Sequence, residues 1–306
     1  MVAAAPTLPA GVPLDLFPFT GKTATIAGHQ MHYLDEGSGD PVVMVHGNPS
    51  WSFYYRNLVT SLSKSHRCIV PDHIGCGLSD KPSDDAYSYT LAQRVDDLTL
   101  LLEQAGVRER VTLVVHDWGG MIGMAWANRH PERIARLVIL NTAAFPRPEQ
   151  MSLPFTLRLT RTPLGSLLVR GLNAFSAGAA RMCFERPTTQ EIRRAYQAPY
   201  DSWANRIATL RFVQDIPLSP SDPGYQIVSE VEQGLGQFAE TPTLLCWGAK
   251  DFVFNDGFYA RWRELMPHAE FHYSEDCGHY VLEDAREEID ELTRDFFDRH
   301  PIPSAS

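Results

Sequence analysis

The sequence predicts an α/β protein: a mostly parallel central sheet flanked by helices, with a helical cap inserted after the sixth strand. Short, nearly continuous apolar runs alternate with amphipathic stretches of helix length through the first half of the chain. Continuous apolar runs are typical of strands covered on both faces, and their alternation with helices indicates βαβ units. The alternation stops at residue 146, where a helical stretch begins, and resumes near residue 242.

The elements before residue 146 follow one another in the order that this fold class requires. "TATIAGHQMHYLDEG" predicts an antiparallel hairpin at the edge of the sheet. The apolar runs predict strands at Pro41–Gly47, Arg67–Gly75, Val111–Asp117 and Ile134–Thr142. The stretches between them predict helices at Ser52–Ser63, Thr90–Ala105 and Trp118–Arg129, of which the third ends before Pro131.

The rest of the chain predicts a cap and the end of the sheet. Residues 146–225 have a helical pattern, rich in Arg, Phe, Tyr and Pro. We then expect a strand in Pro242–Asp251, a helix near Phe258–Leu265, a strand in Ala269–His279 and a closing helix at Glu283–Asp298. The chain would divide into a main domain, residues 1–145 and 226–306, and a cap domain, residues 146–225. The cap would cover the carboxyl ends of the strands, where such sheets bind ligands.

The composition excludes several classes of function and predicts a cytoplasmic protein. The net charge of −10 argues against a nucleic-acid binder, which needs basic patches. The five cysteines are scattered without a CxxC pair, so we expect reduced thiols and neither a zinc site nor a redox motif. The N-terminus lacks the pattern of a signal peptide, and no apolar run reaches the roughly 20 residues that span a bilayer.

The segment "VHDWGG", Val115 to Gly120, has the form of a nucleophile elbow, in which a reactive side chain sits on a tight turn between a strand and a helix. Many hydrolases place a serine there, but this chain has Asp117. On this motif alone, Asp117 could simply cap the following helix, which aspartate does well.

Three further segments stand where such a hydrolase site needs them. "HGNP", His46 to Pro49, follows an earlier strand, where the second oxyanion-hole amide is expected at Asn48. His279 follows the last strand, and Asp251 follows the strand before it. Nucleophile, acid and histidine therefore come in the chain order of this fold. The combination favours a catalytic Asp117 over a helix cap.

The motifs "HGNPSWSFYYRNL", "PDHIGCGLSDKP", "HDWGGMIG" and "GHY" resemble those of haloalkane dehalogenases, α/β hydrolases with an aspartate nucleophile. The resemblance extends from about Phe17 to Phe297. Within that superfamily, "LVILNTAAFP", "NAFSAGA", "AYQAPYDSWANRIATLRFVQDIPLSP" and "KDFVF" resemble most closely the β-lactone decarboxylases of bacterial long-chain olefin synthesis, a group that overlaps the third dehalogenase subfamily. The resemblance implies the α/β-hydrolase fold and no cofactor or metal.

The residue types fit this chemistry. A carboxylate at position 117 suits displacement at a saturated carbon, giving an alkyl–enzyme ester. His279 would activate water to hydrolyse the ester, and Asp251 would orient the imidazole. The backbone N–H groups of Asn48 and Trp118 would form the oxyanion hole. Their side-chain N–H groups would hold the leaving halide, as the matching pair does in haloalkane dehalogenases; alternatively, Trp118 only packs under the cap.

Three functions fit these residues. Hydrolytic dehalogenation, giving alcohol and halide, agrees most directly with the five site residues. The alternative is decarboxylation of a cis-β-lactone to an alkene and CO2 by the same aspartate, with the Asn48 and Trp118 donors holding the departing carboxylate. An epoxide hydrolase is third, because it would need two cap tyrosines, for which Tyr196, Tyr200 and Tyr225 are available. A catalytically inactive binding scaffold would have lost at least one of these residues.

One departure from the dehalogenase pattern concerns the acid. Many haloalkane dehalogenases carry it after the "RLVIL" strand, where this chain has Asn141, so we assign the role to Asp251. Glu275 and Asp276 lie on the same turn as His279, too close in sequence to face its ring nitrogen. We expect His116 to be an orienting or a buried hydrogen-bonding residue and not a catalytic base.

The expected partners are a small apolar substrate, either a haloalkane or an alkyl β-lactone, and a halide ion. A homo-oligomer or a larger pathway assembly is also expected. The cap arginines would form a solvated face with ion pairs, or contact a partner subunit; they are Arg158, Arg161, Arg170, Arg193, Arg194, Arg206 and Arg211.

Overall fold

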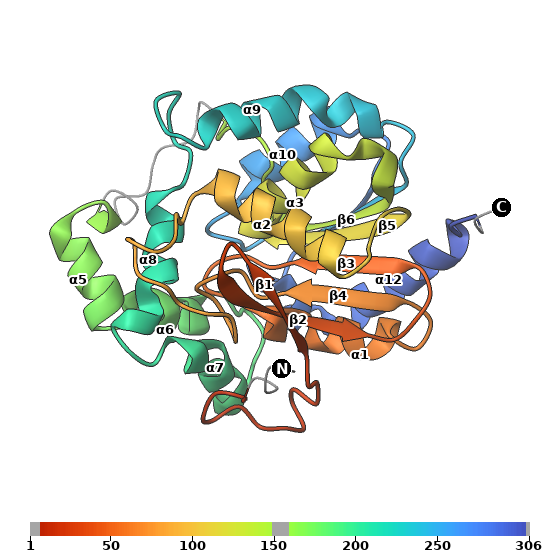
Figure 1. Ribbon diagram of the computed structural model, residues 1–306. Coiled ribbons are helices and arrows are strands. Elements are labelled where there is room, and N and C mark those ends of the chain that lie inside the picture. Colours follow the sequence, from red (N-terminus) through yellow and green to blue (C-terminus); the bar gives the residue numbers. More distant parts are fainter. Residues whose placement is uncertain (1–6, 149–158, 304–306) are drawn as a thin grey trace.

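The computed structural model describes residues 7–148 and 159–303. Figure 1 shows a central sheet with helices on both faces and a group of helices beside the end of the sheet at which the arrows of the parallel strands point. The fold class predicted from the sequence is therefore confirmed.

The sheet has eight strands in the order β1-β2-β4-β3-β5-β6-β7-β8. The two first pairings, β1 with β2 and β2 with β4, are antiparallel, and all the others are parallel. The predicted hairpin is thus found at the edge. The strands are β1 (Lys22–Ile26), β2 (His29–Glu36), β3 (Pro41–Val45), β4 (Arg67–Pro71), β5 (Val111–Asp117), β6 (Ile134–Thr142), β7 (Thr243–Gly248) and β8 (Glu270–Ser274).

The helices before β6 and after the cap cover the two faces of the sheet. They are α1 (Arg56–Leu62), α2 (Leu91–Gln104), α3 (Trp118–Arg129), α9 (Tyr225–Gly234), α10 (Asp256–Leu265), α11 (Val281–Asp284) and α12 (Arg286–Arg299). The described cap helices are α5 (Pro163–Gly171), α6 (Ala174–Met182), α7 (Gln190–Gln197) and α8 (Ile207–Gln214). The expected division into two domains stays a prediction, and residues 149–158 of the expected cap, with Arg158, lie outside the described residues.

Each face of the sheet has its own apolar core, because successive side chains of a strand point to opposite faces. Val43 and Val45 of β3 join a core with α2, α3, α9 and α10. Val42 and Met44 of the same strand join a second core with α1 and α12. This burial on both faces is the physical reason that the strands read as continuous apolar runs.

Two helices differ from the predicted ones. The closing helix is interrupted at Ala285, so that α11 precedes α12 where one helix, Glu283–Asp298, was expected. The stretch predicted as a helix at Ser52–Ser63 begins as a 3-10 turn, Ser52–Tyr55, and continues as α1. Among the described residues, none of the helices is both long and apolar enough to cross a membrane.

Candidate active site

Asp117 ends β5 and stands directly before α3, on the tight turn that the sequence predicted. Its backbone has φ +52°, in the left-handed region that non-glycine residues rarely adopt. Thr142 on the neighbouring strand β6 donates a hydrogen bond to the carbonyl oxygen of Asp117 and so fixes the turn. A side chain at Gly47 would collide with the Asp117 carboxylate, which explains the glycine of the HGNP motif.

Two backbone N–H groups hold one oxygen of this carboxylate. Asn48 N donates to Asp117 Oδ1 over 3.0 Å, and Trp118 N donates to the same atom over 2.5 Å. These are the two amides that the sequence predicted for an oxyanion hole. An oxyanion that formed on Oδ1 would find both donors already in place, and such donors contribute most when they are preorganised.

The other oxygen, Asp117 Oδ2, faces the predicted histidine. His279 Nε2 lies 3.2 Å from it, while His279 Nδ1 lies 2.9 Å from Asp251 Oδ2. The imidazole is therefore sandwiched between two carboxylates, and all three side chains are buried. The remaining oxygen of the acid, Asp251 Oδ1, accepts from the backbone N–H groups of Val253 and Phe254.

This arrangement sets the charges of the resting site. Burial lowers the pKa of a histidine, but the charge and hydrogen bonds of Asp251 and Asp117 outweigh it and raise the pKa of His279 to about 10. Burial raises the pKa of the Asp117 carboxyl, but the hydrogen bond and charge of His279 outweigh it and hold that pKa below its usual value. At neutral pH the site thus holds an imidazolium between two carboxylates.

Asn141 lies at the end of β6 and fixes the acid. Its Nδ2 donates to Asp251 Oδ2 over 2.9 Å and to Gly248 O over 3.1 Å, and its Oδ1 accepts from Gly248 N over 2.8 Å. The side chain is fully buried and the backbone has φ +23°. Sequence analysis singled out this residue as a departure from the dehalogenase pattern but did not identify these partners.

The side chain of Asn48 is only partly available for a leaving group. Its Nδ2 donates over 3.1 Å to the carbonyl oxygen of Thr209 on the cap helix α8. Because a carbonyl can only accept, this contact identifies the amide nitrogen, and one of its two hydrogens is engaged. Asn48 Oδ1 is buried with no partner among the described residues.

Trp118, the second predicted donor, packs against α8 as well. Its ring meets the ring of Phe212 edge-on, with centroids 5.2 Å apart. Phe212 and Thr209 stand three residues apart on α8 and so share one face of that helix. Sequence analysis missed both residues. The segment "TLRF" places Thr209 and Phe212 three residues apart, but nothing in this segment indicates contact with the turn that carries Asp117.

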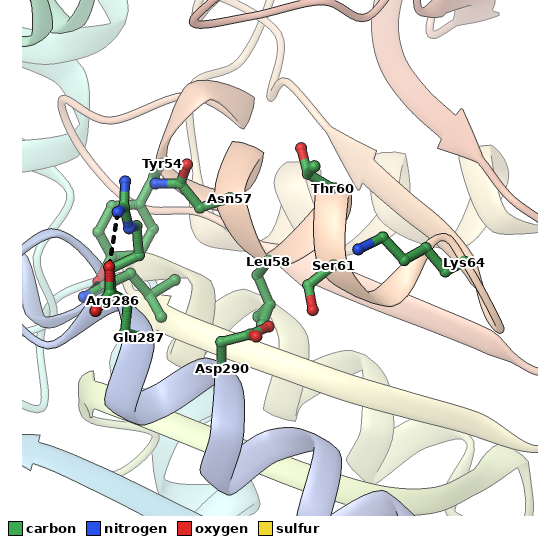
Figure 2. Close-up of a pocket in the computed structure, with 10 residues that line it drawn as sticks. Tyr54, Asn57, Leu58, Thr60, Ser61, Lys64, Arg286, Glu287 and Asp290 are labelled. Atoms are coloured by element: carbon green, nitrogen blue, oxygen red, sulfur yellow. Dashed lines mark hydrogen bonds and ion pairs between the residues drawn. The ribbon is translucent and has the colours of Figure 1, made fainter.

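His116 does not compete for the role of base. Its Nε2 donates over 2.8 Å to the backbone oxygen of His279, and burial lowers its pKa to about 3, so it is neutral. Its ring stacks on Tyr54, with centroids 4.3 Å apart. Tyr54 in turn lines a surface cavity of about 260 Å³ between α1 and the start of α12 (Figure 2), which none of the five predicted site residues lines.

The other candidates for acid and for ring-opening tyrosines lie elsewhere. Asp276 is exposed and pairs with Arg186. The Tyr196 hydroxyl donates to Glu283 Oε1 over 2.5 Å, and that of Tyr200 donates to Ser50 O over 3.3 Å. These two hydroxyls are engaged away from Asp117, which weakens the epoxide hydrolase reading.

A buried ion pair lies close to His279, and the sequence analysis did not predict it. Arg56 on α1 makes two contacts with Glu283 on α11, Nη1–Oε1 of 2.5 Å and Nη2–Oε2 of 3.0 Å. Tyr196 joins them from the cap helix α7, and its ring stacks on Tyr280, the neighbour of His279. The network therefore connects the cap, helix α1 and the segment that contains His279 and Tyr280.

Most of the cap arginines pair within the chain. Arg161 lies 3.5 Å from Asp222, and Arg211 lies 2.6 Å from Asp84. Arg206 donates to backbone oxygens of residues 170, 171 and 200. Among residues 7–148 and 159–303 no group of three or more His, Cys, Asp or Glu side chains is arranged to hold a metal ion, and all five cysteines are buried, unpaired thiols.

Comparison with known proteins identifies related chains. The family described as the α/β hydrolase fold matches residues 40–285. A cis-3-alkyl-4-alkyloxetan-2-one decarboxylase of Shewanella oneidensis is 60% identical over 276 residues, which are 90% of this chain and 87% of the relative. A haloalkane dehalogenase of Mycolicibacterium paratuberculosis is 32% identical over 86% of this chain and 85% of its own. Among solved structures, the haloalkane dehalogenase DatA of Agrobacterium tumefaciens C58 superposes with a TM-score of 0.80, at 26% identity, over 91% of this chain and 96% of that one.

Proposed function

Within the α/β hydrolase fold family, to which this chain belongs, we propose that it acts as a decarboxylase. It would convert cis-3,4-dialkyl β-lactones to an alkene and CO2, with Asp117 as the nucleophile. One observation carries this choice between the two readings of the sequence. The identity to the Shewanella oneidensis decarboxylase is nearly twice that to the Mycolicibacterium dehalogenase, over a similar share of the chain.

The proposed reaction has two steps. Asp117 Oδ2 attacks ring carbon 4 of the lactone, the bond from that carbon to the ring oxygen breaks, and its electron pair leaves a carboxylate on carbon 3. The bond from carbon 3 to this carboxylate then breaks, and its electrons form the double bond. The ester bond to Asp117 breaks at the same time and returns an electron pair to the aspartate. The atoms and electrons balance without water, oxidant or reductant.

Attack at the saturated ring carbon is favoured over attack at the carbonyl. A carboxylate suits displacement at such a carbon. Attack at the carbonyl would give a mixed anhydride, in which the carbon that must leave as CO2 is bonded to Asp117. That bond would have to break again before any alkene could form, and water would convert the anhydride to a β-hydroxy acid.

The charges around Asp117 support both steps. The His279 imidazolium lies 3.2 Å from Asp117 Oδ2, so it stabilises the carboxylate that departs when the ester breaks. The remaining N–H of the Asn48 amide and the indole N–H of Trp118 would receive the carboxylate released from the ring. His279 has no proton to transfer in this reaction, and the imidazolium is the form that the resting site favours.

Gas chromatography of the products tests this proposal. The intact chain is incubated with a cis-β-lactone carrying two alkyl tails, beside the Asp117→Ala variant. We expect alkene from the intact chain and none above background from the variant. Equal alkene from both would refute the role of Asp117, and β-hydroxy acid as the main product would indicate hydrolysis instead of decarboxylation.

Dehalogenation of bromoalkanes is the second candidate, and the backbone hydrogen bonds that hold Asn48 and Trp118 against Asp117 support it. Formation of the alkyl ester would neutralise Asp117, and this removes one of the two carboxylates that keep the proton on His279. The pKa of His279 would then fall, so that the neutral imidazole could take a proton from water.

We also propose that the protein acts in the cytoplasm as a homo-oligomer or within a larger assembly. The five unpaired, buried thiols support a reducing compartment. The resemblance to enzymes of olefin synthesis supports association. Sedimentation velocity at micromolar concentration tests the oligomer, and a monomer at all concentrations would contradict it.

A further inference from the structure

The outer side of the cap carries an exposed apolar patch. Of the ten large apolar side chains that are exposed in the described residues, five lie in the cap. Leu164 and Leu167 of α5 are 57% and 55% exposed, Leu172 just after it is 72% exposed, and Trp203 is 49% exposed. The side chains of Leu167 and Trp203 both lie within 4 Å of the place where a Cβ at Gly171 would stand, so the patch is continuous there. In Figure 1 α5 lies at the outer edge of the molecule, away from the sheet. We call these four side chains the cap patch.

Arginines lie on the cap patch and on the neighbouring helix α6. The Arg170 guanidinium lies over the ring of Trp203, 4.6 Å from its centroid. A shallow groove of about 490 Å³ beside α6 is lined by Ala177, Ala180, Arg181, Arg193 and Gln197. The guanidinium of Arg181 has no hydrogen-bond or ion-pair partner among the described residues, and its backbone oxygen accepts from Arg193.

The surplus of positive charge is a property of the whole described cap. Residues 159–225 hold eight arginines and five acidic residues, so they carry +3 in a chain of −10. Two of the five acids, Asp215 and Asp222, are paired with Arg94 and Arg161. Two of the eight arginines, Arg186 and Arg211, are paired with Asp276 and Asp84 outside the cap. The described cap is therefore basic although the whole chain is strongly negative, and one of its arginines, Arg170, lies on the cap patch.

We propose that the cap patch and the arginines around it dock on an anionic lipid surface. Half-exposed leucines and a tryptophan are the side chains that enter the boundary between headgroups and acyl chains, and arginines beside them are attracted to anionic headgroups. The docking is peripheral. Its use rests on the proposed function, since a lactone with two alkyl tails partitions into lipid, but the docking itself does not depend on that function.

A second copy of this chain fits the patch less well. Two copies related by a two-fold axis would bring the same residues face to face, because such an interface is isologous. Arg170 and Arg181 of one copy would then oppose basic side chains of the other, and like charges at an interface are costly. A lipid surface with anionic headgroups offers opposite charge to these arginines.

Vesicle co-sedimentation of the full chain tests the proposal. We compare vesicles of phosphatidylcholine with vesicles that contain one-third phosphatidylglycerol, at low and high salt. We expect about tenfold stronger binding to the anionic vesicles at low salt, and loss of most of this preference at high salt. The Leu164→Ser/Leu167→Ser variant should bind about tenfold more weakly, since it loses two apolar side chains that would be buried.

Matched controls separate the patch from general effects. Leu100→Ser changes an exposed leucine on α2, and Arg108→Glu reverses an exposed charge outside the cap, so both should bind as the wild type does. Arg181→Glu should weaken binding to anionic vesicles about tenfold. All variants should release bromide from a small bromoalkane at the wild-type rate, or, if that activity is absent, unfold at the wild-type temperature.

Two outcomes overturn the proposal. One is binding that depends neither on phosphatidylglycerol nor on Leu164 and Leu167. The other is a wild-type oligomer that the Leu164→Ser/Leu167→Ser variant splits into monomers, which would identify the patch as an interface between copies. Neither outcome bears on the decarboxylation assay, so failure of the docking proposal and failure of the proposed function remain distinguishable.

Discussion

Replacing Asp117 by Asn should release the proton that His279 holds in the resting site. The two side chains are 3.2 Å apart, and two unit charges at that distance attract by about 5 kcal/mol at an effective dielectric constant of about 20. Since one pKa unit corresponds to about 1.36 kcal/mol, losing this attraction lowers the pKa of His279 by roughly four units. Asp251 remains at 2.9 Å, so the pKa should fall from about 10 toward neutrality.

Nuclear magnetic resonance of histidine-labelled protein measures this shift. The His279 signal is assigned by its absence from the His279→Gln variant, and both proteins are titrated from neutral to alkaline pH. Mass spectrometry checks that the introduced asparagine is intact. A pKa that changes by less than half a unit between wild type and Asp117→Asn would refute the description of an imidazolium held between two carboxylates.

The same charges make stability depend on pH. A histidine whose pKa is raised on folding contributes stability that is fully present below its unfolded pKa, roughly 6.5, and is lost as the pH rises through its folded value. The folded value for His279 is about 10. The free energy of unfolding of the wild type should therefore fall between these two pH values, and that of Asp117→Asn should fall less. Parallel curves would contradict the assignment.

Three more substitutions test other parts of the site. His279→Gln should release one equivalent of bromide from a bromoalkane and then stop, with the alkylated protein visible by mass spectrometry; steady turnover would exclude His279 as the hydrolytic base. Asn141→Ala should lose about 1–3 kcal/mol of unfolding free energy, because both buried backbone groups of Gly248 lose their hydrogen bonds to the Asn141 side chain. It should also lower kcat by freeing Asp251; wild-type values in urea denaturation and rate assays would contradict this. Glu283→Ala leaves the buried charge of Arg56 unpaired and should lower the free energy of unfolding by about 3–5 kcal/mol. Asp295→Ala breaks an exposed ion pair and should lower it by at most about 1 kcal/mol. Equal losses for the two variants would show that Arg56 does not depend on Glu283.

Much of the fold could be predicted because its signals are local. Strands β5 and β6 begin and end where the apolar runs do, Val111–Asp117 and Ile134–Thr142. The break at Ala285 could not be predicted, because neither proline nor glycine marks it. At the break the backbone of Ala285 leaves the helical conformation, with φ −113° and ψ +37°. The residue before it, Asp284, is held by tertiary contacts, because its carboxylate accepts from the N–H groups of Glu185 and Gly278.

The candidate site likewise has parts that local motifs indicate and parts that depend on contacts between distant residues. The turn with Asp117, the HGNP segment and His279 could be found because each motif lies next to a predicted strand end. The partners of Asn48 and Arg56 could not, because Thr209 and Glu283 are far away in sequence and meet them only in the folded chain. Asn141 shows the boundary between the two cases, since the sequence indicates an unusual residue but not that it fixes Asp251.

The central claim is that Asp117 opens a β-lactone and is regenerated as the alkene forms. Its most direct test is to measure, on one preparation, the alkene and CO2 released from a cis-3,4-dialkyl β-lactone and the bromide released from a bromoalkane. We predict alkene and CO2 in equal amounts, with a kcat/KM above that for bromide release. Steady bromide release with the lactone left intact, or converted only to β-hydroxy acid, would contradict the account.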